Sequence, residues 1–138
     1  MIGLVLDANI LVSANLKPGG LEALIVSLGL NRKVRLYISK PILAEYERVL
    51  LYPRLKFDPR EIATFLELFR RAAVLVKPKH VVTSSVDEAD NRFLECAETA
   101  DVAFLITGNQ RHFPKRWKGA EVVNARQLLG LIGTSFLK

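Results

Sequence analysis

Five short apolar runs, separated by segments with helical spacing, constrain the fold of this chain more than any other feature. The runs lie at residues 2–6, 34–38, 73–76, 102–106 and 120–123. Three of them are rich in Val or Ile and lack alternating polar residues, which is typical of strands covered on both faces. The pattern therefore predicts a parallel sheet at the centre of the fold.

Helical patterns occupy the segments between these runs. Apolar residues recur every three to four positions at 21–28, 42–50, 62–69, 93–97 and 124–131. Ser39 before Pro41 and Asp58 before Pro59 are typical helix starts. Because strands and helices alternate, we expect an α/β protein. The prediction is a three-layer α/β/α sandwich with a mostly parallel sheet of about five strands, formed by a single domain over residues 1–138.

Composition narrows the class of protein. Twenty Lys and Arg against fourteen Asp and Glu give a net charge of +6, which favours a polyanionic partner, although a charged surface also keeps a protein soluble. The single Cys96 excludes an internal disulfide and is interpreted as a small core residue. The chain starts without a basic and then apolar leader pattern, and no apolar run approaches the roughly 18 residues of a membrane span. We expect a cytoplasmic protein with no membrane partner.

Polar residues stand where several of the predicted strands end. Asp7 directly follows the first run, and Asn109 follows the fourth. Glu45 lies about one turn into the helix after the second run, and Asp90 opens the helix before the fourth. The carboxyl ends of parallel strands meet at one edge of a sheet, so these four side chains are expected to converge there. Asp7 taken alone is equally typical of a helix N-cap.

These positions belong to an ordered set of motifs. The set is Leu6-Asp7-Ala8-Asn9, Glu45, Asp90-Asn91-Arg92-Phe93-Leu94-Glu95 and Thr107-Gly108-Asn109. In order, spacing and strand context it resembles the PIN-domain nucleases, especially the toxin-like branch akin to VapC toxins. The resemblance implies metal-dependent cleavage of single-stranded RNA, with Asp7, Glu45 and Asp90 as catalytic residues that hold Mg²⁺ or Mn²⁺. It also implies a homodimer and an antitoxin protein as partner.

The residue types suit this chemistry. Mg²⁺ and Mn²⁺ prefer carboxylate oxygens and retained water. Three carboxylates in one cleft repel one another, and the positive charge of a divalent ion offsets this repulsion. Because such an ion also activates water and polarises a phosphate, no Ser, Cys or His nucleophile is required.

Asn109 departs from the family pattern, in which many members place a fourth acid after the Thr-Gly step. An amide forms hydrogen bonds but carries no charge. We therefore expect Asp7, Glu45 and Asp90 to hold one well-occupied ion, while Asn109, as the fourth catalytic residue, orients water or substrate.

Asn9 and Thr107 are expected to support the metal ligands. Each is able to hydrogen-bond a ligand carboxylate or a metal-bound water and so fix its orientation. The alternative is a local role, in which Asn9 starts a helix and Thr107 satisfies loop backbone.

The segment 110–118 concentrates four cations and two aromatic residues. We expect Arg111 and Lys115 to bind RNA phosphates. For Phe113 and Trp117, anchoring of the loop to the core is favoured over stacking on an unpaired base.

Other polar residues receive structural interpretations. His80 and His112 are expected to be exposed. Asp87 is expected to support a turn or the start of the following helix. Glu95 and Glu98 are expected to face solvent.

Two functional hypotheses follow. The first is an endoribonuclease, the toxin of a toxin–antitoxin pair. The second is a catalytically weak RNA-binding module that keeps the fold and the basic segment, a reading that Asn109 supports.

Overall fold

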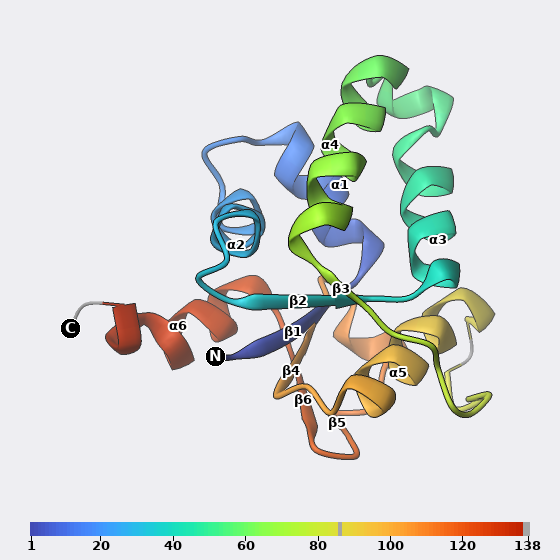
Figure 1. Cartoon of the computed structure of the whole chain (residues 1–138), viewed down its shortest axis with the longest axis vertical. Helices are drawn as coiled ribbons and strands as arrows, with labels where there is room; N and C mark the ends of the chain where they lie inside the picture. The colour runs from blue at the N-terminus through green and yellow to red at the C-terminus, as the bar shows by residue number, and fades with distance from the viewer. Residues whose placement is uncertain (86, 137–138) are drawn as a thin grey trace.

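A mostly parallel sheet forms the central layer of the computed structural model, which describes residues 1–85 and 87–136 (Figure 1). Within these residues the strands pair in the order β3-β2-β1-β4-β6-β5. Their bounds are β1 Gly3–Leu6, β2 Arg35–Ile38, β3 Val74–Leu75, β4 Phe104–Ile106, β5 Arg116–Trp117 and β6 Ala120–Val123. Every neighbouring pair except β5 with β6 is parallel, which confirms the predicted sheet type.

Strand β5 is one strand more than the sequence predicts. It pairs antiparallel with β6, in a register that joins Arg116 to Glu121 and Trp117 to Ala120. The turn between the two strands places Lys118 in the left-handed region, with φ of 54°. Because β5 has only two residues and lies in the charged segment, it carries no apolar run from which to predict it.

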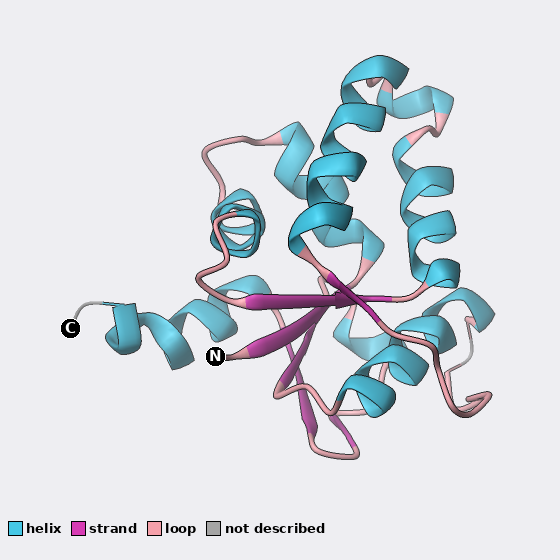
Figure 2. Ribbon diagram, in the orientation of Figure 1, coloured by secondary structure: helices cyan, strands magenta, loops and turns pink. Residues whose placement is uncertain are grey.

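Helices cover both faces of the sheet (Figure 2). They are α1 Ala8–Leu16, α2 Leu21–Leu30, α3 Lys40–Leu50, α4 Pro59–Ala72, α5 Glu88–Ala100 and α6 Ala125–Phe136. Helices α1 to α4 gather on one side, and α5 lies against β1, β2 and β4 on the other (Figure 1). The predicted three-layer arrangement is therefore confirmed. Helix α6 runs through Gly133, so the predicted helix end at residue 131 is wrong.

Side-chain caps define the starts of three helices. The Ser39 hydroxyl accepts a hydrogen bond from the Ile42 amide at 3.3 Å, and Asp58 accepts one from the Arg60 amide at 2.8 Å. Asp87 caps α5 by accepting from the Ala89 amide at 3.0 Å. Each cap satisfies one of the amide groups that the first turn of a helix leaves free. The predicted roles of all three residues at helix starts are confirmed.

The core is built from the apolar faces that the sequence indicates. Leu4, Val5 and Leu6 of β1 are fully or almost fully buried, as is Cys96 of α5, which confirms its assignment to the core. The Tyr46 hydroxyl donates to the Leu6 carbonyl at 2.6 Å and thereby ties α3 to the end of β1. No helix in the described part of the chain is long and apolar enough to cross a membrane.

Glu95 is buried, so the prediction that it faces solvent is wrong. Its carboxylate accepts a hydrogen bond from the Val82 amide at 2.9 Å and pairs with Arg92 at 2.9 Å. Glu98 is half-buried and lies 3.5 Å from the Lys118 ammonium. Residues 79–82 lie against α5, because the Lys79 amide donates to Thr99 and the Val82 amide to Glu95, and helical periodicity does not reveal these contacts.

Candidate active site

Asp7 directly follows β1, which together with β4 forms the central pair of strands in the sheet. Strand β1 pairs with β2 on one side and with β4 on the other, although β2 and β4 are far apart in the sequence. A crevice forms outside the strand ends where the strand order reverses in this way. The Asp7 amide donates to the Ile106 carbonyl at 2.9 Å, which fixes the backbone at this point.

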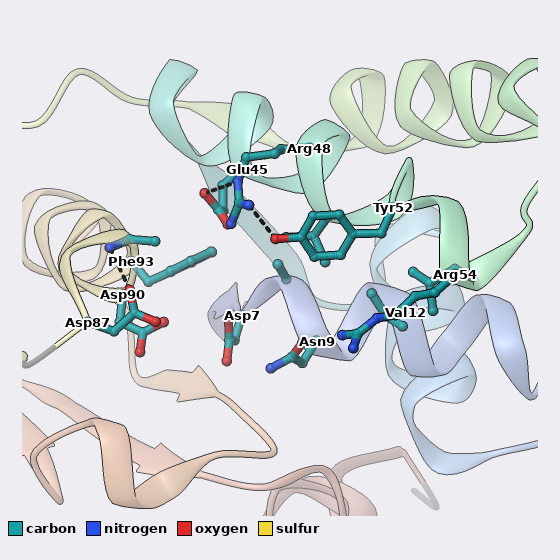
Figure 3. Close-up of a pocket in the computed structure, with 14 residues that line it drawn as sticks. Asp7, Asn9, Val12, Glu45, Arg48, Tyr52, Arg54, Asp87, Asp90 and Phe93 are labelled. Carbon is teal, nitrogen blue, oxygen red and sulfur yellow. Dashed lines mark hydrogen bonds and ion pairs between the residues drawn. The ribbon is translucent and has the colours of Figure 1, made fainter.

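A cavity of about 200 Å³ opens at this edge of the sheet. Figure 3 shows Asp7 between Asn9 and the pair of Asp87 and Asp90 at the start of α5, with Glu45 lying above them on α3. The structure thus brings together the three acids that the sequence nominates, and it adds Asp87. Asn9 also lines the cavity but is exposed.

Asp7 is 4% exposed, which makes its charged form costly. Burial raises the pKa of its carboxyl group above the ordinary value, whereas the hydrogen bond from the Thr107 hydroxyl acts to lower that pKa. The Thr107 hydroxyl donates to Asp7 Oδ2 at 2.7 Å and accepts from the Asn109 amide at 3.0 Å. Thr107 is itself fully buried, so it holds the Asp7 carboxylate in one orientation.

Asp90 is the second buried acid of the cavity. Desolvation, followed by the negative charges of Asp7 and Asp87, raises the pKa of Asp90 to about 7, against the opposing influence of His112. Its Oδ2 atom is buried and has no hydrogen-bond donor among the described residues. His112 Nδ1 lies 3.5 Å from this oxygen, which is longer than an ordinary hydrogen bond.

Glu45 faces the cavity while paired with a cation of its own helix. Its carboxylate accepts hydrogen bonds from two nitrogens of Arg48, and the same guanidinium donates to the Tyr52 hydroxyl. The Arg48 guanidinium also lies 5.3 Å from the centre of the Tyr52 ring. Among the four acids of the cavity, Glu45 is the one that pairs with a Lys or Arg among the described residues.

The other predicted residues lie outside the acidic cavity. Asn109 is exposed and, with Arg111 and His112, lines a neighbouring hollow. Lys115 is exposed on another hollow, beside Glu121. Phe113 is buried and Trp117 packs against the core, in agreement with the anchoring role favoured from the sequence.

Sequence reasoning missed one possible cation cluster. One ligand atom from each of Asp87, Asp90 and His112 lies within 4.8 Å of the other two. The His112 side chain is 54% exposed, as expected, but it faces Asp90 rather than open solvent alone. The spacing of Asp87 and Asp90, one helical turn apart at a helix start, was the available signal; nothing in the sequence places His112 beside them.

Known proteins share this sequence pattern and fold. The sequence matches the family described as PIN domain over residues 3–111. It is 30% identical over 112 residues to an uncharacterized protein, MJ1680 of Methanocaldococcus jannaschii, across 79% of this chain and 72% of that protein.

Two crystal structures contain chains with a similar fold. One is VapBC2 from Rickettsia felis bound to a DNA fragment from its promoter, with a TM-score of 0.62 and 16% identity over 89% of this chain and 98% of that one. The other is DNA-bound VapBC from Salmonella typhimurium, with a TM-score of 0.62 and 16% identity over 91% and 99% of the two chains. These likenesses concern the fold, whereas the family match spans most of the sequence. This chain belongs to the PIN-domain family.

Proposed function

We propose that this protein is a divalent-metal-dependent nuclease that hydrolyses phosphodiester bonds of single-stranded RNA. The observation that carries the proposal is the cavity at the end of β1, where Asp7, Asp87 and Asp90 gather without a Lys or Arg partner among the described residues. Buried carboxylates without compensating cations are costly, and a divalent ion supplies that compensation. Membership of the PIN-domain family gives independent support.

The donor set fits Mg²⁺ or Mn²⁺. Asp7, Glu45 and Asp90 offer hard oxygen ligands from three different elements, and Asp90 Oδ2 forms no hydrogen bond with any described residue. A bound ion would supply Lewis-acid activation of water and stabilise charge on the phosphate. Thr107 keeps Asp7 oriented for this role, and we propose Asn9 as a further hydrogen-bonding residue at the rim.

The residues beside the cavity support RNA as the substrate. Arg111 is exposed next to Asn109, where it is placed to hold a backbone phosphate, and Lys115 extends the same basic segment. We propose that Asn109 orients water or the substrate from this side. The net charge of +6 attracts a polyanion over longer distances.

The proposed biological role is that of a toxin held in check by an antitoxin protein. The VapBC complexes with a similar fold are the basis for this partner. A homodimer and a cytoplasmic location are proposed with it, on the family resemblance.

Asn109 and the Glu45–Arg48 pair favour a second candidate function. Both reduce the negative charge available to an ion, as expected of an RNA-binding module with weak chemistry. RNA binding without cleavage under every metal condition would select this candidate.

The test is cleavage of a labelled single-stranded RNA with Mg²⁺, with Mn²⁺ or with a chelator. We compare the wild type with Asp7→Asn, which retains an acceptor for the Thr107 hydroxyl. We expect Asp7→Asn to lower the rate of RNA cleavage at least roughly 100-fold, which corresponds to a loss of about 3 kcal/mol of transition-state stabilisation. Asp58→Asn is the matched control, because Asp58 caps α4 through its side chain and Asn caps helices equally well. Equal rates in all three proteins would refute the proposal.

A further inference from the structure

The cavity that holds the acids also has a wall with two positive charges. Besides the acids, it is lined by Arg48, Tyr52 and Arg54, which we call the basic wall. Figure 3 shows Tyr52 between Arg48 and Arg54, on the side of the cavity away from Asp87 and Asp90. The same cavity therefore presents carboxylates on one side and guanidinium groups on the other.

The Tyr52 side chain positions both guanidinium groups. The Arg48 guanidinium carbon lies 5.3 Å from the centre of the Tyr52 ring, and that of Arg54 lies 5.7 Å from it. A cation within about 6 Å of the centre of an aromatic ring is attracted to the ring. The Tyr52 hydroxyl also accepts a hydrogen bond from Arg48. One aromatic side chain thus holds two positive charges at the cavity.

The backbone of the basic wall is held in a tight turn. Directly after α3, residues Pro53–Leu55 form a short 3₁₀ helix. The Tyr52 carbonyl accepts from the Leu55 amide at 3.0 Å, and the Tyr52 amide donates to the Val49 carbonyl at 3.2 Å. Lys56 ends the turn in the left-handed region, with φ of 56°. The basic wall is therefore assembled before any ligand binds, which lowers the entropy cost of binding.

The charges of the basic wall suit an anionic ligand. Its two guanidinium groups face one carboxylate, that of Glu45, which pairs with Arg48. The Arg48 side chain is 54% exposed, and Arg54 is exposed as well. An ion pair that is open to solvent is worth little, so Arg48 is able to bind a second anion at small cost. The planar fork of a guanidinium group fits two oxygens of a phosphate.

We propose that Arg48 and Arg54 bind a backbone phosphate of the RNA strand, next along the strand from the phosphate at the acids, while Tyr52 positions both guanidinium groups. The inference rests on the proposed function, since it assigns a further contact to the same substrate. A single strand that enters this cavity carries a phosphate on every nucleotide, so its next phosphate is the anion available to the basic wall. Arg111, in the neighbouring hollow, is a separate contact of the same strand.

RNA affinity in the absence of metal tests this assignment. Fluorescence anisotropy of a short labelled oligouridine, at low salt and with a chelator, measures binding without cleavage. We expect Arg54→Gln to weaken binding about tenfold, because hydrogen bonds to charged groups are worth this much or more. Arg54 is the clearer probe of the two arginines, because its replacement leaves the Glu45–Arg48 pair in place.

The salt dependence of binding distinguishes a phosphate contact from a structural role. The slope of log affinity against log salt concentration should become shallower by about 0.7 in Arg54→Gln, the value of one phosphate contact on a single strand. Arg54→Lys keeps the charge but loses the fork, so it should retain the wild-type slope with an affinity between the other two. Arg35→Gln is the matched control, because Arg35 is exposed at the start of β2, away from the cavity, and its loss changes the net charge equally.

Unchanged affinity and slope in Arg54→Gln would overturn the proposal. Equal losses in Arg54→Gln and Arg35→Gln would also overturn it, because they would show a general effect of net charge. A slope in Arg54→Lys as shallow as that in Arg54→Gln would contradict a phosphate contact. The same is true if the wild type does not bind the oligouridine at low salt.

The proposed nuclease function fails or stands separately, because this binding is measured without metal. RNA binding that depends on Arg54, without cleavage by the wild type in Mg²⁺ or Mn²⁺, would keep the phosphate contact and remove the nuclease function. Metal-dependent cleavage by the wild type, with equal RNA affinity in the wild type and Arg54→Gln, would keep the nuclease function and remove the phosphate contact.

Discussion

Asp90 lies where its charged form is poorly stabilised without a metal. It is buried, two further acids raise its pKa, and one oxygen lacks a donor. The charged form of Asp7 is better stabilised, because the Thr107 hydroxyl donates a hydrogen bond to its carboxylate. Holding these acids side by side costs free energy, and a bound divalent ion would offset that cost.

The raised pKa of Asp90 predicts a pH-dependent stability in the metal-free protein. With a pKa of about 7 when folded and an ordinary value of 3.8, the carboxyl group binds a proton in the folded state that it lacks in the unfolded state. The free energy of unfolding therefore falls as pH rises through this window, by at most about 1.4 kcal/mol per pH unit, and this contribution is level above it.

Urea unfolding with a chelator at several pH values measures this slope. The difference between the wild type and Asp90→Asn isolates the contribution of Asp90, because all other titrating groups are shared. A difference that does not change with pH would contradict the pKa assigned here.

The site depends on how α3 is tied to β1. Tyr46 is fully buried, donates to the Leu6 carbonyl at 2.6 Å and packs edge-on against Phe69 with ring centres 5.5 Å apart. This contact holds the helix that carries Glu45 beside the strand that ends at Asp7. Helix α5, which begins after Asp87 and carries Asp90, lies on the opposite face of the sheet (Figure 1).

Tyr46→Phe removes that hydrogen bond without creating a large cavity. We expect the free energy of unfolding to fall by about 1 to 2 kcal/mol, because the Leu6 carbonyl loses its donor in a buried position. Chemical denaturation provides the measurement. Tyr37→Phe is the control, since it removes a tyrosine hydroxyl from β2 and leaves the bond between Tyr46 and Leu6 in place; a loss of equal size there would show that the Leu6 contact is not responsible.

Most elements were predictable because they follow from local patterns. The apolar runs gave the strands around Asp7 and Asn109, and capping by Ser39 and Asp58 gave the helix starts. Strand β5 and the burial of Glu95 were not predictable, since both depend on segments that pack together only in the folded chain. The site divides in the same way. Asp7 follows from a strand end, and Glu45 and Asp90 follow from the helices that carry them, whereas His112 reaches Asp90 through tertiary structure alone.

At the scale of the whole molecule, a basic protein carries an acidic cavity. The net charge of +6 favours a polyanion, but the acids Asp7, Asp87 and Asp90 disfavour a phosphate close to the cavity. In the proposed function, a bound divalent ion would offset this repulsion where the phosphate approaches the cavity.

Metal binding is therefore expected to stabilise the whole fold. An ion that binds only the folded protein raises the free energy of unfolding by about 1.4 kcal/mol per tenfold increase in its concentration above the dissociation constant. For a chain of this size the melting temperature should rise by several degrees, roughly 4 °C per tenfold step. Thermal unfolding across a Mn²⁺ series measures the effect. Equal shifts in the wild type and Asp7→Ala would contradict binding at this cavity.

The central claim is that this cavity hydrolyses RNA with the help of a metal ion, and the chemical ends of the RNA products test it most directly. Attack by water, the chemistry expected of the acidic cavity, leaves linear phosphate and hydroxyl ends. Attack by the neighbouring 2′-hydroxyl leaves 2′,3′-cyclic phosphates instead. Mass spectrometry of the products should find linear ends that require Mg²⁺ or Mn²⁺ and are lost in Asp7→Asn; cyclic ends that form equally with a chelator and in Asp7→Asn would contradict the account.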